Sequence, residues 1–183
     1  MITEAKLRKE IAIPEKVHVT LDKELTVKGP KGEIKRCINE PSVKMEVQGN
    51  KVVLSPTNFN KRQKMLLNTC RSHIINMIKG VQDLYEYKLK VCSSHFPMSV
   101  TIEGNIFVVK NFLGEKVPRK SKILPNVKVA VQGDVVTVTG PDLEAVSQTA
   151  ANIEQSTRIT NRDRRVFQDG LWIISKAGVE VSK

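Results

Sequence analysis

Residues 43–56 read VKMEVQGNKVVLSP and residues 127–141 read VKVAVQGDVVTVTGP, so one pattern occurs twice in the chain. Both segments begin with Val-Lys, carry Val-Gln-Gly followed by Asn or Asp, and continue into an apolar run that stops at Pro. Further matches precede them in the same order and at a nearly constant offset: residues 17–21 with 98–102, residues 25–28 with 106–109, and Gly32-Glu33 with Gly114-Glu115. This series indicates an internal duplication, and each copy is interpreted as one structural unit.

Each copy carries the pattern of several antiparallel strands. Gly49-Asn50 and Gly133-Asp134 stand between alternating apolar runs, which is the short-range signal of a β-hairpin. Gly104-Asn105 has the same setting, and residues 17–21 alternate as a half-buried strand does. Residues 29–32 (GPKG) lack the spacing of a phosphate-binding loop and predict a hairpin turn.

One amphipathic helix follows in each copy. The apolar stripe of the first helix consists of Leu66, Cys70, Ile74, Met77 and Ile78. Its expected N-cap is Asn58 or Asn60, and its expected end is Gly80. The second helix opens at Asp142 and has an apolar stripe of Leu143, Val146, Ala150 and Ile153. The predicted fold class is α+β, with two tandem duplicated units that each pack an antiparallel-rich β-sheet on one helix.

The boundary between the units is expected near residues 90–97. Residues 88–92 alternate as a last strand of the first unit, and residues 93–97 lead into the second copy. We therefore assign residues 1–93 to the first α+β repeat and residues 94–183 to the second.

The composition describes a basic protein with enough apolar residues to form a core. The 183 residues include 30 Lys and Arg against 19 Asp and Glu, a formal net charge of +11. Nucleic acid is the commonest partner for such a charge, and an anionic membrane surface is the main competitor. No window of the sequence approaches the roughly 18 apolar residues of a membrane span. Residues 1–10 lack the apolar core of a secretory signal. The three cysteines are scattered, which favours a reducing compartment.

Two basic segments lie outside the apolar periodicity of the second half. Residues 110–122 hold five basic residues and one acid, in a connection between strands, and residues 158–165 hold four arginines and one acid, after a helix end. There, guanidinium and ammonium groups can reach phosphates. Basic residues at 61–64 flank a helix start, where backbone N–H groups also favour an anion. The predicted RNA-binding residues are Lys110, Lys116, Arg119, Lys120, Lys122, Arg158, Arg162, Arg164, Arg165, Lys61, Arg62 and Lys64.

Folded RNA fits the sequence better than other nucleic acids. Platforms that stack bases need several exposed rings, and the chain has five Phe, two Tyr and one Trp, mostly at apolar pattern positions. No helix-turn-helix or zinc-finger signature is present in the sequence, and the Gly-x-x-Gly run at residues 29–32 is interpreted as a hairpin turn. RNA recognised through its backbone and 2′-hydroxyl groups is therefore favoured over sequence-specific DNA or single strands.

Two Cys-x-x-His pairs are the strongest alternative. Cys70 with His73 and Cys92 with His95 nominally suffice for one zinc ion or for a thiol nucleophile. Cys70 lies in the apolar stripe, where a free cysteine behaves as a small hydrophobe, and nothing in the sequence orients either histidine. We expect no enzymatic activity, no metal, no cofactor and no small-molecule substrate.

Motifs along nearly the whole chain resemble the universal large-subunit ribosomal protein L-six family, called protein L-nine in eukaryotic cytosolic ribosomes. They are residues 27–32 (VKGPKG), 72–81 (SHIINMIKGV), 95–97 (HFP), 111–116 (NFLGEK) and 164–172 (RRVFQDGLW). The resemblance implies two tandem copies of one α+β fold. It also implies as partners the large-subunit ribosomal RNA near the factor-binding face and the sarcin–ricin loop, together with neighbouring ribosomal proteins.

The resemblance further implies a structural constituent of the large ribosomal subunit that binds ribosomal RNA and supports translation in the cytosolic ribosome. In that family the second unit makes much of the RNA contact, through its C-terminal segment as well as its loops. Eukaryotic relatives have a longer, Lys-rich segment where this chain has only residues 49–60, so we expect a divergent, compact member. A stand-alone RNA chaperone with the same fold is the alternative.

Overall fold

The computed structural model describes residues 8–181, apart from residues 22–23, 39–40 and 58–59. The chain divides into two compact units, Met1–Leu84 and Tyr85–Lys183. Each unit has its own hydrophobic core, built from strands and one long helix. The predicted α+β class with two duplicated units is therefore confirmed.

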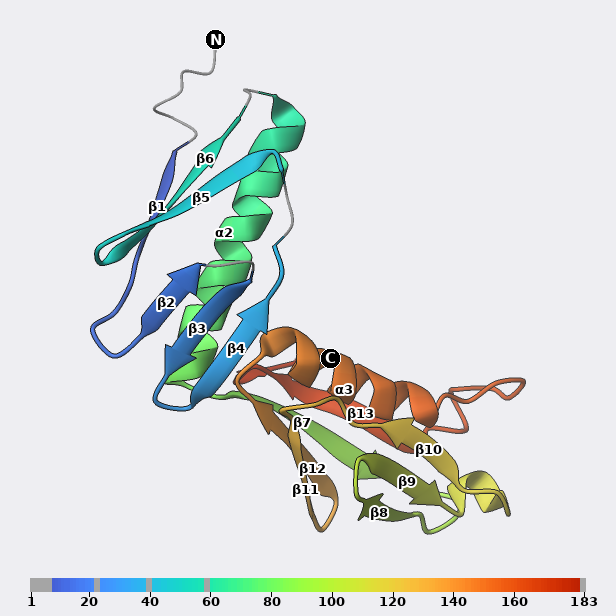
Figure 1. Ribbon diagram of the computed structural model, residues 1–183. Coiled ribbons are helices and arrows are strands. Elements are labelled where there is room, and N and C mark those ends of the chain that lie inside the picture. Colours follow the sequence, from blue (N-terminus) through green and yellow to red (C-terminus); the bar gives the residue numbers. More distant parts are fainter. Residues whose placement is uncertain (1–7, 22–23, 39–40, 58–59, 182–183) are drawn as a thin grey trace. The chain divides into compact units, whose positions relative to one another are not determined.

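The first unit packs helix α2 (Lys61–Gln82) against two three-stranded antiparallel sheets (Figure 1). One sheet has the order β1-β6-β5, formed by β1 (Lys9–Ala12), β6 (Lys51–Pro56) and β5 (Val43–Gln48). The other has the order β2-β3-β4, formed by β2 (His18–Leu21), β3 (Leu25–Gly29) and β4 (Gly32–Arg36). Strand alternation turns the apolar residues of both sheets toward the helix, and their burial supplies most of the stability of the unit.

Helix α2 begins where the sequence predicts and ends later. Asn60 is the N-cap, and its backbone N–H donates to Oε1 of Gln63 at 3.3 Å. The alternative cap, Asn58, lies outside the described residues. Gly80 was expected to end the helix, but this expectation is wrong: Gly80 is buried within the helix, which continues to Gln82. Val81 explains the continuation, because it is fully buried and its carbonyl accepts a hydrogen bond from Lys31 N at 2.9 Å.

The second unit packs helix α3 (Leu143–Ser156) against a five-stranded and a three-stranded sheet. The larger sheet has the order β11-β12-β7-β13-β14, formed by β11 (Lys128–Gln132), β12 (Val135–Gly140), β7 (Tyr85–Cys92), β13 (Gly170–Lys176) and β14 (Val179–Glu180). The smaller has the order β10-β9-β8, formed by β10 (Arg119–Lys122), β9 (Ile106–Lys110) and β8 (Ser99–Glu103). A short 3-10 helix, η1 (Phe112–Gly114), lies between β9 and β10.

Strand β7 places the boundary between the units earlier than expected. The alternation of residues 88–92 predicted the last strand of the first unit, whereas β7 pairs with β12 on one side and β13 on the other. The units divide after Leu84 rather than after Ser93. Strand β7 has the place in the second unit that β1 has in the first, since each pairs antiparallel with the strand that precedes the helix. The strand between the two helices thus opens the second copy instead of closing the first.

The three hairpins predicted from Gly-Asn or Gly-Asp turns are present with two-residue turns, and the hairpin predicted at residues 29–32 is present as well, with Gly29 paired with Gly32. Gln48 pairs with Lys51, Glu103 with Ile106, and Gln132 with Val135. The turn glycines Gly49, Gly104 and Gly133 have φ values of 57°, 61° and 58°, in the left-handed region that glycine adopts without strain.

Candidate RNA-binding surface

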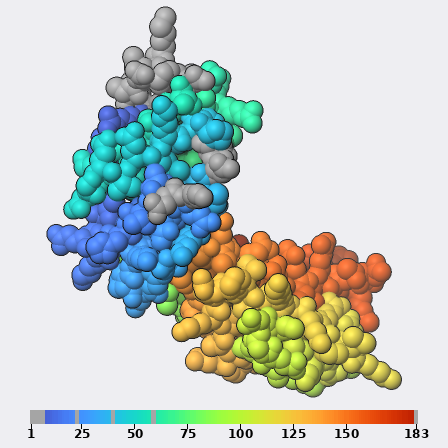
Figure 2. All heavy atoms as spheres, in the orientation of Figure 1, coloured from blue at the N-terminus to red at the C-terminus, as the bar shows by residue number. Residues whose placement is uncertain are grey.

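The two predicted basic segments lie together at one end of the second unit. In Figure 1 the loop after α3 and the loop around η1 reach the same end of this unit, and in Figure 2 the atoms near residues 115 and 160 protrude there. The connection is direct, because the Arg119 guanidinium donates to the Arg158 carbonyl oxygen at 3.0 Å. Residues 119–122 form strand β10 rather than a plain connection, so Lys120 and Lys122 project from one face of the strand while Ser121 is buried.

Most of the predicted RNA-binding side chains of this unit are exposed. The exposed members are Lys110, Lys116, Lys120, Lys122, Arg158, Arg162, Arg164 and Arg165. A cluster of cations at one end of a unit concentrates positive potential there, which attracts a polyanion.

Arg119 differs from the other predicted residues because its guanidinium binds within the unit. It donates to both carboxylate oxygens of Glu115, at 2.8 and 2.6 Å, and to the carbonyl oxygens of Ser156 and Arg158, both at 3.0 Å. It also lies over the ring of Phe112, 4.3 Å from the centroid. The hydrogen bond from Arg119 lowers the pKa of Glu115, and its effect exceeds that of burial, which acts to raise it. Arg119 therefore fastens η1 and β10 to the end of α3.

Residues 158–169, here called the arginine loop, are organised by the single acid of the second basic run. Asp163 accepts from the backbone N–H of Arg165 at 2.9 Å and from its guanidinium at 2.8 Å. The Asp163 carbonyl accepts from the N–H groups of Val166 and Phe167 at 3.1 and 2.9 Å. The side-chain and then the backbone hydrogen bond from Arg165 lower the pKa of Asp163, so the carboxylate stays ionised at neutral pH. Asp163 thus fixes the turn from which Arg164 and Arg165 project.

Aromatic rings hold two arginines of this loop in place. The Arg162 guanidinium carbon lies 4.8 Å from the ring centroid of Phe167, and that of Arg164 lies 5.7 Å from the ring of Trp172. The imidazole of His95 also stacks on Phe167, with the ring centroids 4.7 Å apart. A guanidinium stacked on a ring keeps its N–H donors available at its edge, so these arginines are positioned before they meet an anion.

Asp169 anchors this stack and is not among the site residues predicted from the sequence. Its side chain is only 1% exposed, and it accepts hydrogen bonds from the backbone N–H groups of Ser94 and His95 at 2.6 and 3.0 Å. It also accepts from Ser94 Oγ at 3.1 Å and contacts His95 Nδ1 at 2.6 Å. Burial acts to raise the pKa of Asp169, but the hydrogen bonds from His95 and Ser94 outweigh it and hold the pKa well below its ordinary value. The only available signal was an acid at the end of a strongly basic segment, directly before a strand.

The predicted basic residues of the first unit lie in the first turn of α2. Lys61, Arg62 and Lys64 are exposed, and this turn carries no acidic residue. Cations at this position oppose the helix dipole, so the arrangement does not serve the stability of the helix.

The residues of the alternative zinc or thiol site have separate surroundings. Cys70 is buried in α2 within the core of the first unit, whereas Cys92 ends β7 in the second unit. His95 is bound to Asp169. Within the described part of the chain, no group of three or more His, Cys, Asp or Glu side chains is arranged to hold a metal ion. Among the described helices, none is both long and apolar enough to cross a membrane.

A profile of the Ribosomal protein L6 family matches residues 13–84 and residues 96–170 of the chain, one segment in each unit. The chain belongs to the ribosomal protein L6 family. Three relatives carry the name large ribosomal subunit protein uL6. That of Methanobrevibacter smithii is 47% identical over 177 residues, which cover 96% of this chain and 99% of the relative.

The other two L6 relatives have similar identity and extent. The protein of Methanococcus vannielii is 46% identical over 175 residues, 95% of this chain and 96% of the relative. The protein of Natronomonas pharaonis is 44% identical over 168 residues, 91% of this chain and 95% of the relative. This L6 chain and the three relatives therefore align over nearly their full lengths.

Proposed function

We propose that this chain is a structural, non-enzymatic constituent of the large ribosomal subunit, and that it binds the ribosomal RNA of that subunit mainly through its second unit. The observation that supports this role most directly is the cluster of exposed cations at the end of the second unit, in a member of the L6 family. We further propose that the protein lies near the factor-binding face of the subunit, in the cytosolic ribosome, and contacts neighbouring ribosomal proteins there.

The mechanism that we propose is electrostatic. Lysines of β10 and arginines of the arginine loop would bind phosphates, neutralise the repulsion between adjacent RNA segments and release their counterions. The hydrogen bond from Arg119 to Arg158 would hold the two segments together and those of Asp163 would fix the turn of the arginine loop, so that little ordering entropy is lost on binding. Lys61, Arg62 and Lys64 would supply a second contact at the start of α2, where an anion relieves the unfavourable charge of the first turn.

Sedimentation tests the ribosomal role. We expect the protein to remain with the large-subunit peak of a sucrose gradient after a high-salt wash, in stoichiometric amount. Release to the top of the gradient would favour the alternative of a free RNA chaperone. Cross-links to RNA from a photoreactive residue at position 116 would then report whether the bound region belongs to the factor-binding face.

Salt titration tests the RNA contacts. Replacement of Arg162, Arg164 and Arg165 by Ala should lower the slope of log affinity against log salt by about 2.1–2.7, because each of three neutralised phosphates contributes roughly 0.7–0.9. The matched control replaces three exposed lysines outside the predicted surface, Lys35, Lys44 and Lys128, by Ala. Equal slopes for the two triple variants would contradict the proposed surface.

A further inference from the structure

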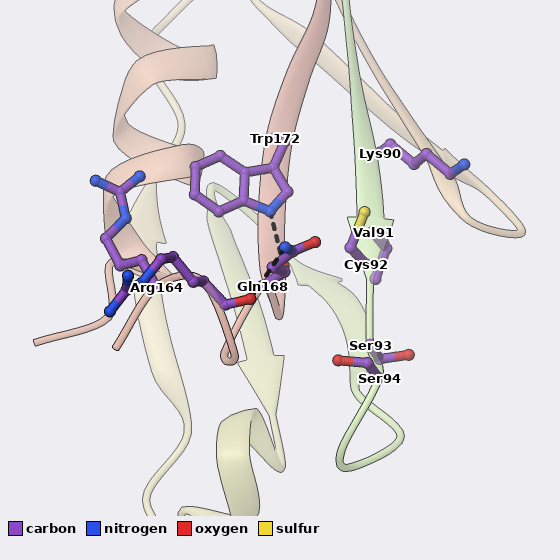
Figure 3. A pocket seen from close by; sticks show the side chains of 9 residues that line it. Lys90, Val91, Cys92, Ser93, Ser94, Arg164, Gln168 and Trp172 are labelled. Carbon is purple, nitrogen blue, oxygen red and sulfur yellow. Dashed lines mark hydrogen bonds between the residues drawn. The ribbon is translucent and has the colours of Figure 1, made fainter. Parts of the chain in front are cut away.

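A groove of about 740 Å³ lies on the second unit beside the arginine loop. Its floor is the pair of strands β7 and β13, in which Lys90 and Trp172 are directly opposite each other. Arg164 and Gln168 of the arginine loop border it on one side (Figure 3), and Arg165 of the same loop also lines it. The groove therefore combines residues that are about 80 positions apart in sequence.

Strand alternation decides which side chains reach this groove. Leu89 and Leu171 are 0% and 1% exposed and belong to the core that includes α3 residues. Their neighbours Lys90 and Trp172 consequently project from the opposite face of the sheet. Figure 3 shows the indole of Trp172 on the Arg164 side of the groove, whereas the side chain of Lys90 extends from the neighbouring strand away from the indole.

The ring of Trp172 lines the groove and is held at its edge by a hydrogen bond. Its Nε1–H donates to the carbonyl oxygen of Gln168 at 3.1 Å, which anchors the edge of the indole (Figure 3). The Arg164 guanidinium lies over the same ring, with its central carbon 5.7 Å from the ring centroid. An anchored π surface next to a guanidinium is suited to a second flat, electron-rich group.

The charges around the groove favour an anion, and the ring of Trp172 favours a ligand that also carries a flat group. The lining residues, all in the described part of the chain, include the cations Lys90, Arg164 and Arg165 and no acid. Asp163 lies nearby, paired with Arg165 at 2.8 Å. Ser93 and Ser94 also line the groove; Ser94 donates to Asp169, and the hydroxyl of Ser93 is a polar group that can meet the edge of a base.

We propose that this groove binds one unpaired nucleotide, with its base stacked on Trp172 and its phosphates at Arg164, Arg165 and Lys90. The inference rests on the proposed RNA-binding function and deepens it. Bases inside a duplex are covered by their neighbours and present no face to a protein ring, whereas a bulged or loop nucleotide does. The groove therefore adds selection for an unpaired base to a surface that otherwise binds backbone charge.

The fluorescence of Trp172 tests this proposal, because it is the only tryptophan of the chain. The intact protein is titrated at fixed salt with single-stranded octaadenylate, with an eight-base-pair RNA duplex, and with heparin as a polyanion without bases. We expect the single strand to quench Trp172 strongly and the duplex and heparin to leave it nearly unchanged. Equal changes with all three probes, or octaadenylate binding without quenching, would overturn the proposal.

Substitution gives an independent measurement by anisotropy of labelled octaadenylate. Trp172→Leu should weaken binding roughly ten-fold without a change in salt slope, because stacking is lost while no charge is removed. Trp172→Phe should retain most of the affinity, and Val166→Ala, at an exposed residue of the same loop that does not line the groove, should alter it less than two-fold. Unaltered affinity in a folded Trp172→Leu protein would also overturn the proposal.

The same titrations separate this proposal from the proposed function. If the protein binds large-subunit ribosomal RNA with a steep salt dependence but Trp172 is not quenched, only the nucleotide groove is refuted. If it binds no RNA at low salt, the RNA-binding function itself fails.

Discussion

At the scale of single residues, Asp169 is a buried charge of the second unit that depends on its hydrogen bonds. Replacement by Asn removes the charge and places an amide N–H group where the carboxylate accepts from Ser94 and His95. We expect Asp169→Asn to lower the free energy of unfolding by about 2 kcal/mol at pH 7, because hydrogen bonds to a buried charge are lost. Denaturant titration followed by Trp172 fluorescence measures this loss in the second unit.

The pH dependence of the same variant follows from the lowered pKa of Asp169. A carboxyl with a lower pKa in the folded state stabilises the fold above its unfolded pKa of about 3.9. That contribution is lost as the pH falls from about 4 toward the folded pKa. The wild type and Asp169→Asn should therefore converge in stability as the solution is acidified, and a constant difference down to pH 2 would contradict this assignment.

Arg119 and Lys120 are adjacent in β10 and should respond oppositely to replacement by Ala. Arg119→Ala loses four hydrogen bonds within the unit and should cost about 2 kcal/mol of stability. Lys120→Ala removes an exposed cation, so it should change stability by less than about 0.5 kcal/mol and lower the RNA salt slope by roughly 0.7–0.9. Thermal unfolding measures the stability of both variants, and salt titration measures their RNA binding. If Arg119→Ala lowers the salt slope of RNA binding without destabilising the unit, Arg119 contacts RNA rather than stabilising the fold.

The candidate surface was only partly predictable from sequence for reasons that these residues illustrate. Charge runs identified the two basic segments, because charge is a property of local composition. The internal role of Arg119 depends on the carbonyl groups of Ser156 and Arg158, nearly forty positions away, and no local pattern encodes that contact. Asp169 and Trp172 were not predicted as site residues for the same reason, because their partners Ser94 and Lys90 precede them by more than seventy positions.

At the scale of secondary-structure elements, the start of α2 combines unfavourable local electrostatics with a proposed binding role. Lys61→Glu should stabilise the first unit by roughly 0.5–1 kcal/mol, because an acid in the first turn suits the helix dipole. It should also weaken binding to large-subunit RNA, with Lys61→Gln intermediate in both properties. Circular-dichroism melts and salt titration measure the two effects. Greater stability with unchanged RNA affinity would remove Lys61 from the proposed surface.

Elements with local determinants were predicted well, and those that depend on distant contacts were not. The three hairpins followed from Gly-Asn or Gly-Asp between alternating runs, and both helices from their apolar stripes. The end of α2 was missed because tertiary contacts of Val81 extend the helix beyond Gly80. Strand β7 was recognised as a strand but assigned to the first unit, because periodicity shows which face is buried without showing which strands lie alongside.

At the scale of the whole molecule, the position of β7 predicts where the chain can be divided. A fragment of residues 85–183 retains the whole five-stranded sheet and should fold cooperatively, with Trp172 in its native environment. A fragment of residues 94–183 lacks the strand that joins β12 to β13 and should remain largely unfolded. Circular dichroism and amide chemical-shift dispersion distinguish the two outcomes. Folding of the shorter fragment would show that the second unit does not need β7 for its stability.

The central place of β7 also sets the order in which a newly synthesised chain can acquire its structure. The elements of the first unit are complete once Gln82 has been made, whereas β7 receives its second neighbour only when residues 170–176 exist. Until then β7, which has one apolar face, is present with an unpaired edge, a feature that promotes aggregation. During translation, the first unit is ready to fold early, and the unit that carries most of the proposed RNA contacts matures only once residues 170–176 have been made.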